Sequence, residues 1–586
     1  MPRIATPSLF CTLAGLVFCA CSNSDYANNT RQNYGGRPVA KQVFSEFPES
    51  GFFTEAFTVE LPENDSLNCE AGGKIPNAQS QRASTFRFDS TTTIRCLHLS
   101  DTAKTEIIRT YIFEEKPTIA AVFLTADPNS LFDPDSGIYM TGLNAQEEVP
   151  HDGANYWLDK EIPVYVELVE SDQNYPAFAK HAGLKIFGKY SRINPKKSVA
   201  INFREKYDDK RLHYPLFPEF PELTVFKSFI LRNNGNNFSN DYIRDRLASS
   251  LSEGLGVDYQ RGRFATVYYN GEYFGIHDLR ERSNESYIET HYGISKNNIN
   301  LLKSSGKSTA GSATSYSALI QWLKSHSLDI DSNYAHIDSL IDIDNLLNYL
   351  HTEIFANNLD WPGNNLKRWN IVNPQSKWKW ILYDMDAGFG TLPYDDINIF
   401  EYMTSQAKVG YNKNAPIATF LIRCLLKNKE FEAAFINRLA VLLQTNFEQS
   451  KILARIDKMM SEIEQEIPRD QQRWSHDKAH MDEQLEIIKE FARTRAGIVT
   501  DNLRDFFDLE ETVPVTLATS GPGTILVHGL PLNESEITID FFKNYPVTLT
   551  AKPQKGHKWG GWSDGDTNST RTIFSKNALT LTAIYK

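Results

Sequence analysis

The spacing of apolar residues changes twice along this 586-residue chain. Apolar and polar residues alternate in short runs near both ends, a period of two that is typical of half-buried strands. Later in the central region the apolar residues recur three and four positions apart, as on one face of an amphipathic helix. A chain of this length exceeds one hydrophobic core. We therefore predict a multidomain protein with an N-terminal β-sandwich over 42–116, a β-rich lead-in over 117–180, a central α+β domain over 181–508 and a small C-terminal β module over 514–586.

The first residues have the layout of a bacterial secretory signal. Arg3 supplies a positive charge, an apolar run follows at 9–20, and polar residues come after Cys21. As a helix this run is about 18 Å long, which is too short for a hydrocarbon core of about 30 Å. We therefore predict a signal peptide over 1–21 rather than a membrane span.

The end of this signal resembles a lipobox, because small Ala20 precedes Cys21. Phe18 and Cys19 depart from the usual pattern, so secretion without a lipid is the alternative. We predict a lipoprotein that is attached to the membrane through Cys21 by a polar linker over 22–41 and lies outside the cytoplasm at the cell envelope.

Three of the six cysteines lie in the signal region, which leaves Cys69, Cys96 and Cys424. Cys69 and Cys96 lie in one stretch of β-like sequence, and an oxidising compartment would allow them to form a disulfide. Two buried thiols are the alternative. Cys424 lies in an apolar helical run, and we expect it to be a core residue.

The two β-rich ends resemble small modules of other proteins. Residues 42–116 resemble the Ig-like modules of secreted carbohydrate-active and surface proteins. Residues 514–586 resemble a bacterial surface β-repeat, in which a strand ending in Thr-Ala-x-Pro precedes Gly-x-x-x-x-Gly-Trp. Trp559 and Trp562 either stack on a surface polysaccharide or fill the core of this small module, and we favour the core.

The charge balance bears on the class of partner. The formal net charge is −12 at pH 7. Nucleic-acid binding draws most of its affinity from Lys and Arg side chains that neutralise phosphates. We therefore expect no DNA or RNA partner.

An acid and an amide lie on a loop in the central region. A helical pattern that begins near Ile341 runs into a loop broken by Pro362 and Gly363, which contains Asp360 and Asn365. These two residues are five positions apart, as are the catalytic Asp and the metal-binding Asn of protein kinases.

Two carboxylates follow within 20 residues of this loop. An apolar strand at 378–383 leads directly into Asp384 and Asp386, with Gly388 and Gly390 behind them. Alternate carboxylates at a strand end can bind Mg²⁺ through oxygen ligands, as the metal-binding Asp of kinases does. The two segments therefore predict one metal-assisted site.

Together these motifs resemble the CotH kinase family. The resemblance is carried by Asn-x-Asp-Trp-Pro-x-Asn-Asn at 358–365, Asp-x-Asp-x-x-Phe-Gly at 384–390, and Asn-Gly-Glu-Tyr-x-Gly at 270–275. Asn-Asn-Gly-Asn-Asn at 233–237 and a basic, glycine-containing segment at 188–198 agree with it. The resemblance covers residues 181–400 with specific motifs and extends more loosely to 508.

The resemblance implies an atypical two-lobed kinase fold that binds ATP and Mg²⁺ and phosphorylates protein substrates. By position, Asp360 would be the catalytic acid, Asn365 and Asp384 the metal ligands, Asp386 a competing metal ligand, Lys197 the phosphate-pairing lysine, and Arg192 and Arg232 supporting cations.

The leading hypothesis is therefore a secreted or surface-anchored kinase that transfers the γ-phosphoryl group of ATP to a hydroxyl of a protein at the cell surface. The alternatives are a catalytically inactive kinase-like scaffold and a polysaccharide-binding lipoprotein.

Overall fold

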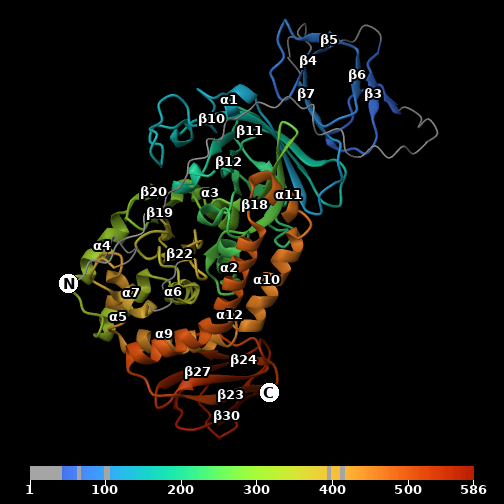
Figure 1. The fold of residues 1–586 in the computed structure, drawn as a ribbon. Coiled ribbons are helices and arrows are strands. Elements are labelled where there is room, and N and C mark those ends of the chain that lie inside the picture. The colour runs from blue at the N-terminus through green and yellow to red at the C-terminus, as the bar shows by residue number, and fades with distance from the viewer. Residues whose placement is uncertain (1–41, 63–66, 98–105, 392–396, 410–415) are drawn as a thin grey trace, which may run out of the picture.

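The computed structural model describes residues 42–62, 67–97, 106–391, 397–409 and 416–586. The predicted signal peptide, the lipid site at Cys21 and the linker lie outside these residues. Within the described ranges, no helix is both long and apolar enough to cross a bilayer. Figure 1 shows an N-terminal β-rich region, a β-barrel, a helical region and a C-terminal β module in a row.

The N-terminal region contains two β-sheets around an aromatic core. The core includes Phe57, Phe88 and Tyr111, whose rings lie 4.7–5.1 Å apart between centroids. One sheet has the order β1-β3-β6 and the other β2-β8-β7-β4-β5. The strands are β1 (Gln42–Phe44), β2 (Gly51–Phe52), β3 (Phe57–Glu60), β4 (Leu67–Ala71), β5 (Gln81–Ala83), β6 (Thr85–Phe88), β7 (Thr92–Leu97) and β8 (Glu106–Ile112).

The cysteine predictions are confirmed. Cys69 on β4 and Cys96 on β7 are directly opposite each other in neighbouring antiparallel strands, and they form a disulfide. Cys424 is buried in α8 (Phe420–Leu425).

A closed barrel follows, with the strand order β10-β11-β12-β15-β18-β17-β9. Its interior is filled by alternate residues of each strand, such as Ile162, Val164, Val166 and Leu168 of β10, because successive side chains of a strand point to opposite faces. The strands are β9 (Ala120–Thr125), β10 (Glu161–Val169), β11 (Pro176–Ile186), β12 (Val199–Asn202), β15 (Ser228–Arg232), β17 (Gly262–Tyr269) and β18 (Glu272–Glu281).

Strand β9 closes the barrel and also joins it to the N-terminal region. Val122 and Leu124 belong to the barrel core, whereas Phe123 packs on the other side against Phe52 and Tyr268. The strands β9 and β10 come from the predicted lead-in, and β11 runs through the predicted boundary at 180/181. The alternating pattern marks these strands, but it does not show that β9 pairs in parallel with β17, far along the chain.

The helical region is built around a mixed sheet of order β16-β22-β21-β19-β20. The strands are β16 (Asp258–Tyr259), β19 (Ile299–Lys303), β20 (Ser308–Ala310), β21 (Lys367–Ile371) and β22 (Lys379–Leu382). The helices are α2 (Arg244–Ser250), α3 (Glu285–Tyr292), α4 (Thr314–Leu323), α5 (Asp331–Leu340), α6 (Ile343–Ala356), α7 (Ile399–Thr404), α9 (Lys429–Leu443), α10 (Gln449–Ile463), α11 (Ile467–Trp474) and α12 (Lys478–Phe507).

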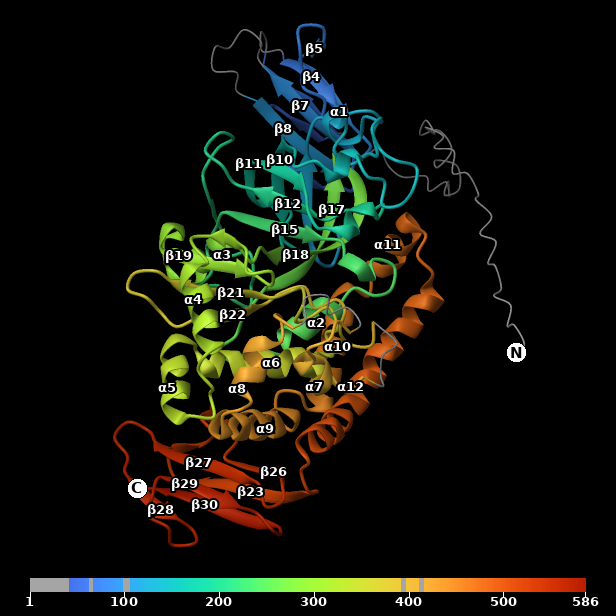
Figure 2. The same ribbon diagram turned by 90° about the vertical axis from the view of Figure 1, so that its left-hand side faces the viewer.

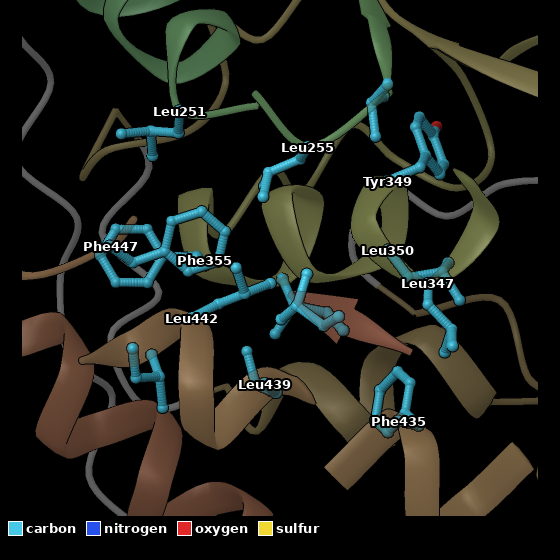
Figure 3. Close-up of a cluster of buried hydrophobic side chains, with 14 of the residues drawn as sticks. Leu251, Leu255, Leu347, Tyr349, Leu350, Phe355, Phe435, Leu439, Leu442 and Phe447 are labelled. Atoms are coloured by element: carbon cyan, nitrogen blue, oxygen red, sulfur yellow. The ribbon is translucent and has the colours of Figure 1, made fainter. Parts of the chain in front are cut away.

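Helix α6 is the centre of this region. It is buried on nearly every face, as expected for a helix surrounded by other elements. Figure 3 shows Leu251 and Leu255 on one side of α6, and Phe435 and Leu439 of α9 on the other. This packing fixes the C-terminal end of α6, from which the loop with Asp360 begins.

Helices α10, α11 and α12 connect the parts of the molecule. The predicted amphipathic segments correspond to α10 and α12, and α11 packs against β18 of the barrel. Figures 1 and 2 both show α12 running from the barrel side towards the C-terminal module.

The C-terminal module packs on α9. It contains the sheets β26-β23-β30-β28 and β25-β24-β27-β29. Trp562 is buried, half-buried Trp559 packs beside it, and both indole N–H groups donate to backbone carbonyls within the module. The strands are β23 (Thr512–Ser520), β24 (Gly523–Val527), β25 (Leu530–Pro531), β26 (Glu536–Phe542), β27 (Pro546–Pro553), β28 (Trp559–Trp562), β29 (Thr570–Phe574) and β30 (Leu579–Tyr585).

Candidate functional site

A cleft of about 720 Å³ lies where the barrel meets the helical region. Among the described residues that line it, ten are Lys or Arg and four are Asp or Glu. The cations are Lys185, Lys189, Arg192, Arg204, Lys227, Arg232, Arg280, Arg282, Lys303 and Lys367. Because the whole chain is acidic, this local excess of positive charge makes the cleft the part of the molecule best suited to a polyanionic ligand.

The end of α6 is held firmly before the loop with Asp360 begins. The helix stops at Asn357, which has a left-handed backbone conformation with φ of 52°. Arg495 of α12 donates to the carbonyls of Ile354 and Phe355 at 2.8 and 3.0 Å, which satisfies acceptors that a helix end leaves free. Asn358 then donates to Glu353 at 2.9 Å.

Two amides orient the carboxylate of Asp360. The Nδ2 groups of Asn364 and Asn365 donate to its two oxygens at 2.9 and 2.8 Å. Burial, together with the nearby charge of Asp384, raises the pKa of Asp360 above its usual value. A carboxylate with a raised pKa is a better proton acceptor, which suits a general base.

The acid-bearing loop and the segment after β22 meet in this cleft. Asn365 also donates from Nδ2 to the backbone carbonyl of Asp384 at 3.1 Å, so the amide bridges Asp360 and Asp384. Asp384 has φ of 63°, in the left-handed region. Residues other than glycine rarely adopt this conformation, and those that do cluster at functional sites. Met385, between the two aspartates, is fully buried and donates its backbone N–H to Asp245 at 3.0 Å. Asp384 and Asp386 therefore both face the cleft.

Arg232 connects three carboxylates at the floor of the cleft. Its Nη2 lies 3.0 Å from Asp384 Oδ1, 3.0 Å from Asp386 Oδ2 and 2.9 Å from Asp245 Oδ2. Burial works against the charge of this guanidinium, but the three acids raise its pKa above the usual range. Arg280 also pairs with Asp245, at 2.7 Å, and although burial opposes ionisation the two arginines lower the pKa of this carboxyl.

The two aspartates of the 384–386 segment differ in their surroundings. The side chain of Asp384 is 27% exposed, whereas that of Asp386 is 3% exposed. Asn236 donates to Asp386 from its backbone N–H and its side chain at 3.1 and 3.3 Å. Burial and the charge of Asp384 raise the pKa of Asp386 to about 7. At Gly235, a Cβ would lie 2.5 Å from Asp386 Oδ2, so this turn can approach the carboxylate only with glycine.

The oxygen atoms at this point suit a hard cation. Across the described ranges, no cluster of three or more His, Cys, Asp or Glu side chains is arranged to hold a metal. Asp384 and Asp386 provide two carboxylates, and Asn365 uses its amide nitrogen for Asp360 and Asp384, which leaves its oxygen as an acceptor. Mg²⁺ typically takes one or two carboxylates and completes its shell with water and phosphate oxygens, so this set fits it.

The predicted cations have different positions. Arg232 and Arg192 line the cleft, and Arg192 donates to the carbonyls of Gly188 and Tyr156 at 2.8 and 3.0 Å. Lys197 is not part of the cleft lining. Its Nζ donates to the carbonyls of Arg192 and Asn194 at 2.5 and 3.0 Å, and burial lowers its pKa to about 7. Lys197 therefore stabilises the backbone of the basic segment and does not face the cleft.

Sequence reasoning missed Lys367, a central cation of the site. Its Nζ donates to the backbone and hydroxyl oxygens of Ser283, both at 2.7 Å, and lies 3.7 Å from the centroid of the Tyr383 ring. Burial lowers its pKa to about 7. Its position two residues after Asn365 was a usable signal. Asp245 was also missed, because only the fold brings it to Arg232.

Comparisons with known proteins identify the family of the central region. The sequence pattern of the family described as CotH kinase protein matches residues 184–499, more than half of the chain, and includes the acids and amides described above. The crystal structure of the Helicobacter pylori proinflammatory kinase CtkA is similar, with a TM-score of 0.23 and 12% identity over 52% of this chain and 95% of that one. No curated protein matches the chain.

Proposed function

Because the chain belongs to the CotH kinase family, we propose that it transfers the γ-phosphoryl group of ATP to a hydroxyl group of a protein substrate. The observation that carries the proposal is the cleft itself. It combines a large excess of Lys and Arg with Asp360, Asn365 and Asp384 on two adjoining loops. Phosphoryl transfer requires mainly this combination, since the protein positions the phosphates, a metal ion and an acceptor hydroxyl.

Asp360 is the proposed catalytic residue. Asn364 and Asn365 hold its carboxylate in place, and it accepts the proton of the acceptor hydroxyl. The hydroxyl oxygen forms a bond to the γ-phosphorus as the bond from that phosphorus to the departing ADP oxygen breaks. Lys367 and Arg192, which line the cleft, bind the phosphate oxygens.

Asp384 and Asn365 are the proposed Mg²⁺ ligands, and Asp386 is the third candidate. Held there, Mg²⁺ would supply positive charge to offset that of the phosphates. Arg232 contacts both carboxylates, but Asp384 is the more accessible of the two, whereas Asp386 also accepts from Asn236. We therefore expect Asp384 to contribute most to metal affinity.

The test is ATP binding and autophosphorylation by the purified full chain. We expect ATP with Mg²⁺ to raise the melting temperature, and labelled ATP to give a phosphorylated protein. The change Asp360→Ala should preserve the thermal shift and remove the labelling. Labelling of Asp360→Ala at the rate of the parent would end the catalytic assignment.

A non-catalytic kinase-like scaffold is the second candidate. The observation that favours it is Arg232, whose Nη2 already lies between Asp384 and Asp386, where it competes with a cation for the same oxygens. This candidate gains support if millimolar ATP with Mg²⁺ gives no thermal shift. If the Trp559 and Trp562 module binds surface polysaccharide instead, pulldown on insoluble glycans will retain the protein.

We also propose that the protein acts outside the cytoplasm, on a protein at the cell surface. The disulfide between Cys69 and Cys96 supports this location, because such bonds persist mainly in oxidising compartments. Membrane attachment through Cys21 is tested by metabolic labelling with palmitate. The change Cys21→Ala should abolish the label, and an unlabelled parent would contradict the lipid anchor.

A further inference from the structure

A second cavity, of about 480 Å³, lies next to the loop that carries Asp360. We call it the aromatic groove, because its lining includes Tyr316 of α4, Tyr349 of α6, Trp361 and Trp380. The exposed side chain of Ile417 and the partly buried side chain of Ile320 add apolar surface at its border. This composition is typical of a site that binds a hydrophobic side chain.

The aromatic groove and the basic cleft share two walls. The first is the chain at 360–368, whose residues line the two cavities in turn. On the cleft side are Asp360, Asn365 and Lys367, and on the groove side are Trp361, Leu366 and Arg368. The second wall is the β19–β20 hairpin, where Lys303 lines the cleft and Ser304 lines the groove. A ligand in the groove is therefore separated from the catalytic acid by one segment of chain.

The charge in the groove indicates what kind of ligand fits. Arg368 is 7% exposed, its guanidinium lies 4.1 Å from the Tyr316 ring centroid, and its Nε has no hydrogen-bond partner among the residues that the structure describes. Lys324 is the other charged residue of the described lining, and no acidic side chain contributes to it. The Tyr316 ring is a partner for one face of this guanidinium, but no acid of the described residues pairs with it, and a carboxylate from a ligand would supply the missing countercharge.

We propose that the aromatic groove docks an acidic and hydrophobic peptide segment of the acceptor protein. An apolar or aromatic side chain of this segment packs against the accessible side chains of Ile320 and Ile417, and a neighbouring carboxylate pairs with Arg368. The identity of the partner rests on the proposed kinase function, whereas docking itself requires neither ATP nor transfer. Docking beside Asp360 raises the local concentration of the acceptor hydroxyl, so it lowers KM and leaves kcat unchanged.

The experiment measures peptide binding to the full chain by fluorescence anisotropy, without nucleotide. The probe is a fluorescein-labelled peptide with two aspartates around a central Trp-Leu pair, and its matched control carries lysines in place of the aspartates. We expect the acidic peptide to bind more tightly than the basic one. The change Arg368→Gln should weaken the acidic peptide about thirty-fold, because it removes one partner of a desolvated charge pair.

Two exposed positions keep the test valid if Arg368→Gln fails to fold. Lys324→Glu and Ile417→Asp change the border of the groove at side chains that no packing requires, and each should weaken the acidic peptide. Lys555→Glu, in the C-terminal module, is the matched control and should bind like the parent. Equal affinity for the two peptides, no binding of either, or full binding by the groove variants would overturn the proposal. Peptide binding without phosphoryl transfer would support docking and contradict the kinase function alone.

Discussion

Two of the buried charge networks at the barrel differ in their surroundings: one lines the basic cleft, and the other is enclosed by side chains. Lys196 and Asp470 join the barrel to α11, with side chains 2% and 0% exposed. Asp470 accepts from Lys196 at 3.0 Å, from Tyr242 at 2.7 Å and from the backbone N–H of Ile276 at 2.7 Å. This network is closed, because both side chains are almost fully buried and the carboxylate is shared among a cation, a hydroxyl and a backbone N–H.

The network around Arg232 is open instead. Three carboxylates share this guanidinium, Asp384 is partly exposed, and the pKa of Asp386 is raised to about 7. A buried charge by itself therefore indicates packing. A site for chemistry is indicated where perturbed charges also border a cavity that a ligand can enter.

The open network should respond most strongly in catalysis. The change Asp360→Asn keeps the shape of the side chain but removes the proton acceptor, so phosphoryl transfer should fall about 10²–10⁴-fold. The affinity for ATP, measured by calorimetry, should stay within about two-fold of the parent. An equal loss of affinity and transfer would mean that Asp360 acts in binding.

The closed network should respond in stability and leave function intact. The change Lys196→Met leaves the Asp470 carboxylate buried without its cation, which should cost about 3–5 kcal/mol of folding free energy. Thermal and urea denaturation measure this loss. Below its lowered melting temperature, the variant should bind ATP as the parent does, and a selective loss of ATP binding would break the comparison.

The guanidinium of Arg232 should compete with a metal ion for the carboxylates of Asp384 and Asp386. Its replacement, Arg232→Gln, removes the cation that holds Asp384 and Asp386. The melting temperature without metal should fall, and the affinity for Mg²⁺ should rise about ten-fold because the carboxylates lose their internal partner. Unchanged Mg²⁺ affinity would show that the ion does not use these oxygens.

The smallest effect is a pH dependence at the contact between the barrel and the N-terminal region. Glu167 on β10 is buried, and burial raises its pKa to about 8, against the opposing effects of Ser50 and Arg109. Because the folded state holds this proton more tightly than the unfolded chain, the stabilisation is complete below about pH 4.5 and is lost as the pH rises through about 8. At about pH 9, the variant Glu167→Gln should therefore melt a few degrees above the parent. Parallel curves for variant and parent would refute this account.

Short-range motifs explain which part of the site could be predicted. Asp360 and Asn365 lie within one loop and Asp384 and Asp386 within one strand end, so their spacing is visible in the sequence. The motifs around these residues predicted membership of the CotH kinase family, and this prediction is confirmed. The basic segment around Lys197 suggested a phosphate-pairing lysine, but only the folded backbone shows that its ammonium group turns away from the cleft.

Long-range contacts explain what could not be predicted. Asp245 joins Arg232 because α2 packs beneath the cleft, and Lys367 joins Ser283 because β21 lies near the end of β18. The closure of the barrel depends on the pairing of β9 with β17, more than 140 residues later. Local patterns predicted a β-rich lead-in and an α+β domain, but not which strands and helices are neighbours.

If the two loops form one Mg²⁺-dependent nucleotide site, calorimetric titration with ATP will detect it. The parent should bind ATP in the presence of Mg²⁺ and bind it far more weakly in EDTA. The change Asp384→Ala should abolish the Mg²⁺-dependent part. Identical ATP affinity for parent and variant, with and without Mg²⁺, would contradict the account.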